Sequence, residues 1–350
     1  MLASVQFLRF VAALMVTIYH AQSATAKVGG SYPQWFLDLV WIGSAGVPVF
    51  FAISGLVMCF TSAGEFGRPG APRAFIARRL LRIFPVYWFA ALFFLAFPPL
   101  YLAGWHGDPW QTLAALLLLP GHAAGIITPG WTLAYELYFY GVFGLLIVLP
   151  ATAAVVTLAA YFLASVAAGA LLPGSNPLLD IATNAQLLVF LAGVLIAHFV
   201  LRNAGAVARG LGRVPASIPF AIAMLGFAVA PILHHQRFPA TLALGLPSVA
   251  LVAAAAIAEA RGSVPRSVTN WAWLGDSSYA LYLIHTLVIW HAAEWLGPHG
   301  ESFLAGGLRI ALLTTVSVVA GLAIHAAFER PLMGWLRRRR RPRPVLQEQH

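Results

Sequence analysis

Long apolar stretches constrain the fold of this chain more than any other feature of its sequence. A transmembrane helix needs about 20 predominantly apolar residues. Hydrophobic residues make up 60% of the chain and charged residues 9%, whereas a soluble domain carries roughly 25% charged residues. The sequence therefore predicts an all-α, polytopic integral membrane helical bundle of about ten transmembrane helices. The predicted spans lie near residues 5–24, 41–61, 83–103, 131–149, 152–172, 184–201, 217–233, 243–260, 274–295 and 308–328.

A further apolar stretch, residues 111–127, is expected not to cross the membrane. Pro120-Gly121 interrupts this stretch and Pro129-Gly130 follows it. Basic residues favour the cytosolic side, and all the arginine clusters fall on one side only if 111–127 is a re-entrant or interfacial segment. With that count, both termini are expected in the cytosol. The clusters lie at residues 68–79, 202–213 and 261–266 and from 337 onward.

The chain is expected to form one transmembrane domain, residues 1–336, followed by a basic cytosolic tail, residues 337–350. The tail contains the run RRRRRPR, and attraction of such a run to anionic lipids is worth about 1 kcal/mol per charge. Membrane lipids are therefore its expected partners. The net charge of +10 is carried by short segments between spans, as topology requires, so we expect no nucleic-acid partner.

The first 26 residues also resemble a secretory signal peptide, because small residues, AQSATA, follow the apolar run. The alternative of cleavage is disfavoured, since the one positive charge, Arg9, does not precede that run.

Arg9 and His20 are the polar residues of interest in the first span, LRFVAALMVTIYH. Their spacing is three helical turns, which places both side chains on one face about 16 Å apart. An arginine at the centre of a span costs about 2.5–3.5 kcal/mol and normally faces the bundle interior or a water-filled cavity. We therefore expect both residues to line a cavity. The structural alternatives are that Arg9 reaches the headgroups and that His20 forms an interhelical hydrogen bond.

A cluster of arginines, Arg78, Arg79 and Arg82, lies in RRLLRIFPVYW at the start of the third span. Spacings of three and four residues bring guanidinium groups to one helix face. Such a cluster is unfavourable unless an anion is bound, and guanidinium groups suit phosphate bidentately. An anionic, phosphate-bearing cosubstrate arriving from the cytosol would fit this pattern, although the charge alone favours topological anchoring.

The segment PGWTLAYELYFYG places a carboxylate, Glu136, within an aromatic run that includes Trp131. A carboxylate inside an apolar bundle either pairs with a cation or takes part in acid–base chemistry. We expect His20 or Arg9 as its partner; a structural ion pair is the alternative.

Polar residues also lie near the end of the chain, in LGDSSYALYLIH. The expected N-cap of the ninth span comprises Asp276, Ser277 and Ser278. The side chains expected to support the site, together with Trp131, are Tyr279, Tyr282 and His285. The pair His325 and Glu329 is expected to be polar pairing at a helix end. We expect no metal, because no HxxxH or HExxH spacing occurs.

These motifs together resemble membrane-bound acyltransferase family 3, in the branch that acts on exopolysaccharides. The resemblance is carried by Arg9-x10-His20, by GSAGVPVFFAISG followed by Arg79-x-x-Arg82, by GWTLAYELYFY and by SYALYLIH with FERP. It implies transfer of an acyl group, usually acetyl, from cytosolic acyl-CoA to a sugar hydroxyl of an exopolysaccharide or its lipid-linked precursor. It also implies a multi-pass protein of the bacterial cytoplasmic (inner) membrane.

The resemblance further implies that Arg79 and Arg82, with Arg78, hold the CoA phosphates and that Arg9, His20 and Glu136 form the catalytic centre. His20 is our candidate general base, because histidine titrates near physiological pH. An acyl-histidine relay is the mechanistic alternative. The alternative function is a transporter or flippase of an acylated or glycosylated lipid.

Overall fold

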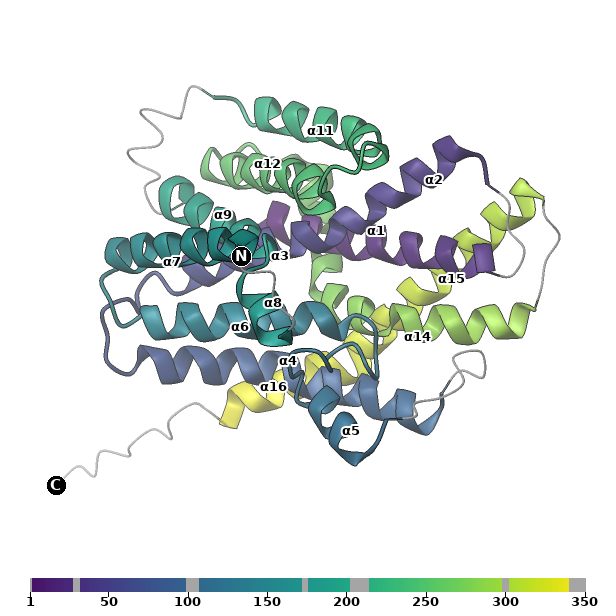
Figure 1. Ribbon diagram of the computed structural model, residues 1–350, viewed down its shortest axis with the longest axis horizontal. Coiled ribbons are helices and arrows are strands. Elements are labelled where there is room, and N and C mark those ends of the chain that lie inside the picture. The colour runs from purple at the N-terminus through teal and green to yellow at the C-terminus, as the bar shows by residue number, and fades with distance from the viewer. Residues whose placement is uncertain are drawn as a thin grey trace.

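The computed structural model describes residues 2–27, 32–98, 107–171, 176–201, 214–297 and 302–339 (Figure 1). Within these ranges the chain forms helices joined by turns, and none of these residues lies in a strand, which confirms the all-α prediction. The elements are α1 (Ala3–Lys27), α2 (Gln34–Trp41), η1 (Ile42–Ala45), α3 (Gly46–Thr61), α4 (Ala71–Ala96), α5 (Pro109–Leu116), α6 (Gly130–Leu146), α7 (Ala151–Leu171), α8 (Pro177–Ala182), α9 (Gln186–Ile196), η3 (Ala197–Leu201), α11 (Ser217–His235), α12 (Ala240–Ala260), α13 (Arg266–Trp271), η5 (Ala272–Ser277), α14 (Ser278–Leu296), α15 (Phe303–Ile324), η6 (His325–Glu329) and α16 (Arg330–Arg339).

Among the described residues, 8 helical segments are long and apolar enough to cross a membrane. Two further predicted spans correspond to α6 and α14, which have 17 and 19 residues. At about 1.5 Å per residue they extend roughly 26 and 28 Å, slightly less than the thickness of a hydrocarbon core. The protein is therefore a helical membrane protein, while the count of ten spans and the cytosolic termini stay predictions.

The stretch expected not to cross the membrane contains only a short helix, α5, of 8 residues. This helix is about 12 Å long, and turns follow it up to the start of α6. Asp108 caps α5, since its side chain accepts a hydrogen bond of 2.7 Å from the backbone N–H of Gln111. A segment built in this way is too short to cross as a helix, which is consistent with the predicted re-entrant or interfacial segment.

The predicted start of the basic tail, residue 337, falls inside α16, which continues to Arg339. Residues 340–350, and the arginines at 202, 209 and 213, lie outside the described residues.

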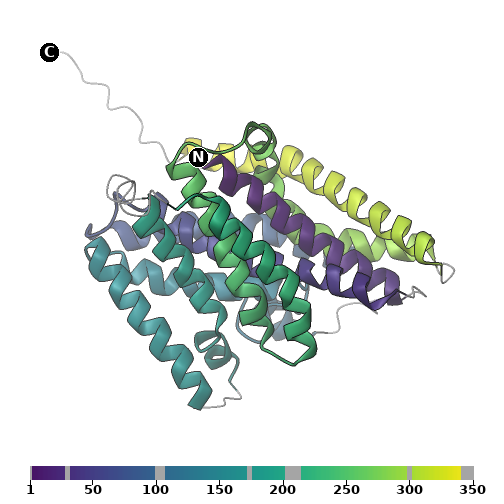
Figure 2. The same cartoon turned by 90° about the horizontal axis from the view of Figure 1, so that it is seen from above.

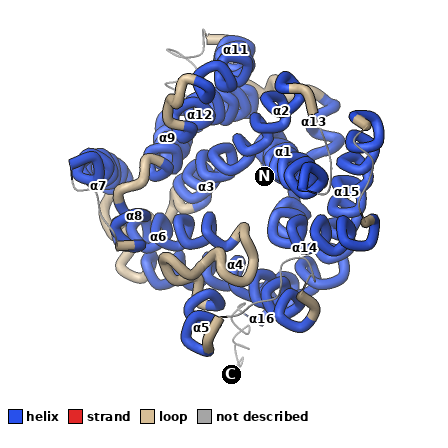
Figure 3. The backbone as a smooth tube through the Cα atoms, turned by 45° about the vertical axis from the view of Figure 1, so that its right-hand side comes forward, coloured by secondary structure: helices blue, strands red, loops and turns tan. Residues whose placement is uncertain are grey.

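The first helix, α1, is the central element of the bundle (Figure 3). It contacts α3, α12, α14 and α15, and Figure 2 shows it running alongside α12 and α15. Its N-terminal end is held by Glu259 of α12, whose carboxylate accepts hydrogen bonds from the backbone N–H of Ser4 at 2.6 Å and from the Ser4 hydroxyl at 2.9 Å. A carboxylate at this end also complements the helix dipole.

Close helix crossings in this bundle depend on glycine. A Cβ atom on Gly55 of α3 would lie 2.0 Å from the carbonyl oxygen of Phe190, and one on Gly193 of α9 would lie 1.9 Å from that of Ala52. Gly46 of α3 meets α1 in the same way, 2.2 Å from the carbonyl oxygen of Ala12. Small residues at such crossings let helix backbones approach in a membrane, where no hydrophobic effect drives them together.

A buried arginine, Arg309 of α15, closes the end of α14. Its Nη1 and Nη2 atoms donate to the carbonyl oxygens of Gly297 at 2.6 Å and Ala293 at 2.7 Å. The last carbonyls of a helix lack intrahelical partners and carry partial negative charge. Arg309 is therefore a structural arginine.

We expect the substitution Gly193→Ala to destabilise the protein by about 1–3 kcal/mol, because the added methyl group meets backbone atoms of α3 that cannot move aside cheaply. Thermal unfolding in detergent measures the effect. The matched control is Gly141→Ala in α6, where a Cβ atom meets nothing within 4 Å. Equal unfolding temperatures for the two variants would contradict the tight crossing of α3 and α9.

Candidate active site

A cavity of about 400 Å³, here called the arginine cavity, lies among α1, α3, α4, α6 and α14. Arg9 of α1 and the pair Arg79 and Arg82 of α4 line it. Glu136 of α6 is the carboxylate among the described lining residues. Three positive side chains against one negative side chain give the cavity a net charge that favours an anion.

The arginines of α4 are held by aromatic rings. The guanidinium carbon of Arg79 lies 5.3 Å from the ring centre of Phe75 and 5.8 Å from that of Tyr140, and that of Arg82 lies 6.0 Å from the ring centre of Tyr279. Nη2 of Arg79 donates to the Thr61 hydroxyl at 3.2 Å. The Nε atom of Arg79 is buried without a hydrogen-bond partner among the described residues, so this side chain keeps a donor for a ligand.

Arg78 does not join the other two arginines. It forms an ion pair with Glu65 and is not part of the cavity lining. Neighbouring residues of an α-helix point about 100° apart, so Arg79 can face the cavity while Arg78 faces the loop that contains Glu65.

Glu136 is held by two hydroxyl groups. Its Oε1 atom accepts a hydrogen bond of 2.8 Å from Ser54 and a second one from Tyr140. Arg9 lines the same cavity and interacts electrostatically with Glu136. The expected partnership with His20 is not observed, because His20 lines a different cavity.

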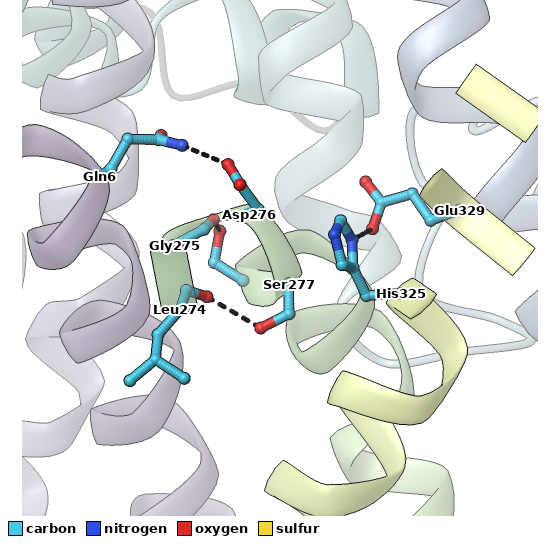
Figure 4. A network of polar contacts seen from close by, with 8 residues as sticks. Gln6, Leu274, Gly275, Asp276, Ser277, His325 and Glu329 are labelled. Atoms are coloured by element: carbon cyan, nitrogen blue, oxygen red, sulfur yellow. Dashed lines mark hydrogen bonds and ion pairs between the residues drawn. The ribbon is translucent and has the colours of Figure 1, made fainter. Parts of the chain in front are cut away.

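Arg9 is positioned by a chain of hydrogen bonds. Its Nη1 atom donates to the Gln6 side-chain oxygen at 3.0 Å, and the Gln6 amide nitrogen donates to Asp276 of η5 at 2.6 Å (Figure 4). The backbones of α1 and η5 approach closely here: a Cβ atom on Gly275 would lie 2.0 Å from the carbonyl oxygen of Gln6. Gln6 was missed in the sequence, although its spacing of three residues from Arg9 is a signal for a shared helix face.

Ser277, one of the residues predicted to cap the ninth span, is the N-cap residue of α14, but the side-chain capping bond expected there is not formed. The Ser277 hydroxyl donates backward to the carbonyl oxygen of Leu274 at 2.8 Å (Figure 4). The Ser278 hydroxyl donates in the same way to the carbonyl oxygen of Gly275 at 2.7 Å. The 3₁₀ turn η5 runs directly into α14, so the first N–H groups of α14 already face the carbonyls of the preceding turn.

A second cavity of about 290 Å³, here called the histidine cavity, is lined by His20 of α1 and His285 of α14. Their ring centres lie 5.2 Å apart. Trp131, at the start of α6, also lines it, five residues before Glu136, or about 7.5 Å along the helix. Val47 and Tyr282 belong to the linings of both cavities, so the two cavities adjoin.

The predicted supporting tyrosines hold α14 in place beside both cavities. The Tyr279 hydroxyl donates to the carbonyl oxygen of Ile83 at 2.9 Å, which ties α14 to α4. The Tyr282 hydroxyl and that of Thr132 lie 2.8 Å apart, which ties α14 to α6. These bonds fix the shared wall between the cavities.

The predicted polar pair of His325 and Glu329, which follows α15, is observed: Nδ1 of His325 lies 2.9 Å from the Glu329 carboxylate (Figure 4). The two residues delimit a π-helical turn, η6. Glu329 is only 3% exposed and interacts electrostatically with Arg9. It therefore adds a second negative charge near Arg9, which its position at a helix end did not predict.

The fold and the cavities define a polytopic membrane protein with a cavity lined by arginines beside a pair of histidines. The family model of acyltransferase family 3, described as an acyltransferase domain, matches residues 2–326. The exopolysaccharide production protein ExoZ of Rhizobium meliloti (strain 1021) is 33% identical over 319 residues, which cover 85% of this chain and 92% of that protein. The acyltransferase MdmB of Streptomyces mycarofaciens is 29% identical over an alignment of 378 residues, which covers 97% of this chain and 93% of that protein.

The chain therefore belongs to acyltransferase family 3, which confirms the resemblance seen in its motifs, and it is a membrane acyltransferase. No solved structure matches the chain.

We expect Gln6→Leu to lower the rate of acyl transfer about 10- to 100-fold, because Arg9 loses the side chain that positions it. Ester formation in membranes, at matched protein levels, measures this effect. Gln34→Leu is the matched control, since it also removes a Gln–Asp hydrogen bond, to Asp38 at 2.8 Å, but away from both cavities. Equal rates for the two variants would show that Gln6 does not position Arg9.

Proposed function

We propose that this protein is an acyl-CoA-dependent O-acyltransferase of the bacterial cytoplasmic membrane. It moves an acyl group, acetyl by family resemblance, from cytosolic acyl-CoA to a sugar hydroxyl of an exopolysaccharide or its lipid-linked precursor. The observation that carries the proposal is the junction of a cationic cavity and a histidine cavity at Val47 and Tyr282. A donor in one and an acceptor in the other would meet at that junction.

The arginine cavity suits an acyl-CoA. Arg79 and Arg82 lie near the middle of α4 and offer forked donors for the phosphates of CoA. Apolar side chains, among them Phe50, Phe51 and Val57, line the rest of the cavity and suit the less polar pantetheine arm. The thioester then lies toward Val47 and Tyr282, with Arg9 available to offset negative charge on its carbonyl oxygen.

The histidine cavity suits the acceptor. Trp131 and Tyr19 line it and offer aromatic faces to a sugar ring. His20 is the proposed general base: it takes the proton of the attacking hydroxyl while the new C–O bond forms and the C–S bond breaks. The proton then passes to the departing CoA thiolate, which restores neutral His20.

The deciding experiment measures alkali-labile O-acyl groups on the surface polysaccharide of a deletion strain complemented with wild type or with His20→Gln. We expect ester to return only with wild type, since loss of a general base costs about 10²–10⁴-fold in rate. Full ester with His20→Gln would refute the role of His20. Unchanged ester with reduced glycan export would favour the transporter or flippase alternative.

The alternative mechanism, a relay through an acyl-histidine, is tested with the same strains. Labelled acyl-CoA, supplied without acceptor, would leave label on His20 if the relay operates. Absence of label with intact transfer supports direct attack.

The donor site has its own prediction. We expect Arg79→Gln to raise the KM for acyl-CoA by about tenfold or more, because a charge-assisted hydrogen bond contributes about 1.5–3 kcal/mol. Steady-state kinetics in membranes measure it. Arg78→Gln is the matched control, since a surface ion pair such as that with Glu65 contributes about 0–1 kcal/mol. A larger effect from Arg78→Gln would place the phosphates elsewhere.

A further inference from the structure

His285 carries a buried nitrogen atom that nothing in the described chain satisfies. Its Nδ1 atom lies 2.6 Å from the carbonyl oxygen of Tyr282. A carbonyl oxygen can only accept, so Nδ1 carries the ring proton and, in a neutral imidazole, Nε2 is a bare acceptor. The side chain is 0% exposed, and Nε2 has no hydrogen-bond partner among the described residues.

A second imidazole, that of His20, lies beside the ring of His285. The two ring centres lie 5.2 Å apart, with their planes at 45°, and both side chains line the histidine cavity. An in-line N–H···N hydrogen bond of about 2.9 Å between two imidazoles places their ring centres about 5 Å apart. The observed separation of the ring centres therefore matches that of such a bond, and catalytic hydrogen bonds often form or tighten only when substrate is present.

We propose that His285 is a positioning residue for His20. Its Nε2 atom accepts a hydrogen bond from one ring nitrogen of His20, and this fixes the tautomer in which the other nitrogen of His20 is bare and free to take the acceptor's proton. The inference rests on the proposed function, in which His20 is the base. The resulting chain runs from the Tyr282 carbonyl through His285 to His20, and it serves as the carboxylate does in a Ser-His-Asp triad.

The surrounding contacts support a positioning role. The Tyr282 hydroxyl is bonded to Thr132 of α6, so the helix turn that supplies the carbonyl is itself fixed. A purely structural residue at this place would gain nothing from an unpaired buried acceptor, because such an atom costs free energy. When His20 takes the hydroxyl proton it becomes a cation, and its hydrogen bond to the neutral His285 strengthens.

The kinetic test compares His285→Leu with His285→Gln. The assay uses labelled acetyl-CoA and, as acceptor, polysaccharide purified from the deletion strain. We expect His285→Leu to lower kcat about 10- to 100-fold while the KM for acetyl-CoA stays unchanged. Glutamine can donate to the Tyr282 carbonyl and accept from His20, so His285→Gln should recover much of kcat.

The matched control is His291→Leu. His291 lies on the same helix and has the same kind of bond, from Nδ1 to the carbonyl oxygen of Leu287 at 2.8 Å, but it lines neither the arginine cavity nor the histidine cavity. We expect wild-type kcat. Wild-type kcat in His285→Leu, or no recovery in His285→Gln, would overturn the proposal.

A second measurement needs no acyl transfer. The nitrogen-15 NMR spectrum of histidine-labelled protein, minus that of His20→Gln, isolates the ring nitrogens of His20. We expect one neutral tautomer coupled to His285 in the wild type and a mixture of tautomers in His285→Leu. A mixture in the wild type would overturn the inference, whereas coupled histidines in a protein that forms no ester would overturn only the proposed function.

Discussion

The rest of this structure depends on one constraint: charged groups inside an apolar bundle must be partnered or must face a cavity. Arg9 meets it through Gln6 and Asp276, Arg79 through aromatic faces and Thr61, and Arg309 through helix carbonyls. These solutions differ in one respect. Both terminal nitrogens of Arg309 donate to helix carbonyls and Arg309 does not line the arginine cavity, whereas Arg9, Arg79 and Arg82 do. An arginine whose terminal nitrogens bond to helix carbonyls therefore supports the fold, whereas an arginine that lines a cavity is a candidate for binding a ligand.

Close helix packing places these charges. Glycine at the crossing of α3 with α9 and at the contact of α1 with α3 brings backbones together, so side chains such as Ser54 and Arg9 reach the same chamber. The aromatic residues of α4, α6 and α14 then surround the arginines. In this way an apolar bundle holds a strongly polar interior without an appended domain in the part of the chain that is described.

Much of the fold could be predicted because long apolar stretches and arginine placement are local properties of the sequence. Arg9, Arg79, Arg82 and Glu136 were found for the same reason: a charge within an apolar stretch stands out. Relations between helices could not be predicted. The separation of Glu136 from His20 depends on the depth at which α6 enters the bundle. The contact of His20 with His285 joins helices far apart in the chain, and the role of Asp276 depends on a 3₁₀ turn that no capping pattern reveals.

The shared wall of Val47 and Tyr282 has a consequence for how such enzymes diversify. The cavity that holds the arginines is lined mostly by α3, with its arginines contributed by α1 and α4, whereas the histidine cavity is lined by α12 and by other turns of α1, α3, α6 and α14. Since only Val47 and Tyr282 belong to both linings, substitutions can accumulate in one lining while the other stays unchanged. Members of the family can thus change which molecule one cavity accepts without altering what the other cavity binds.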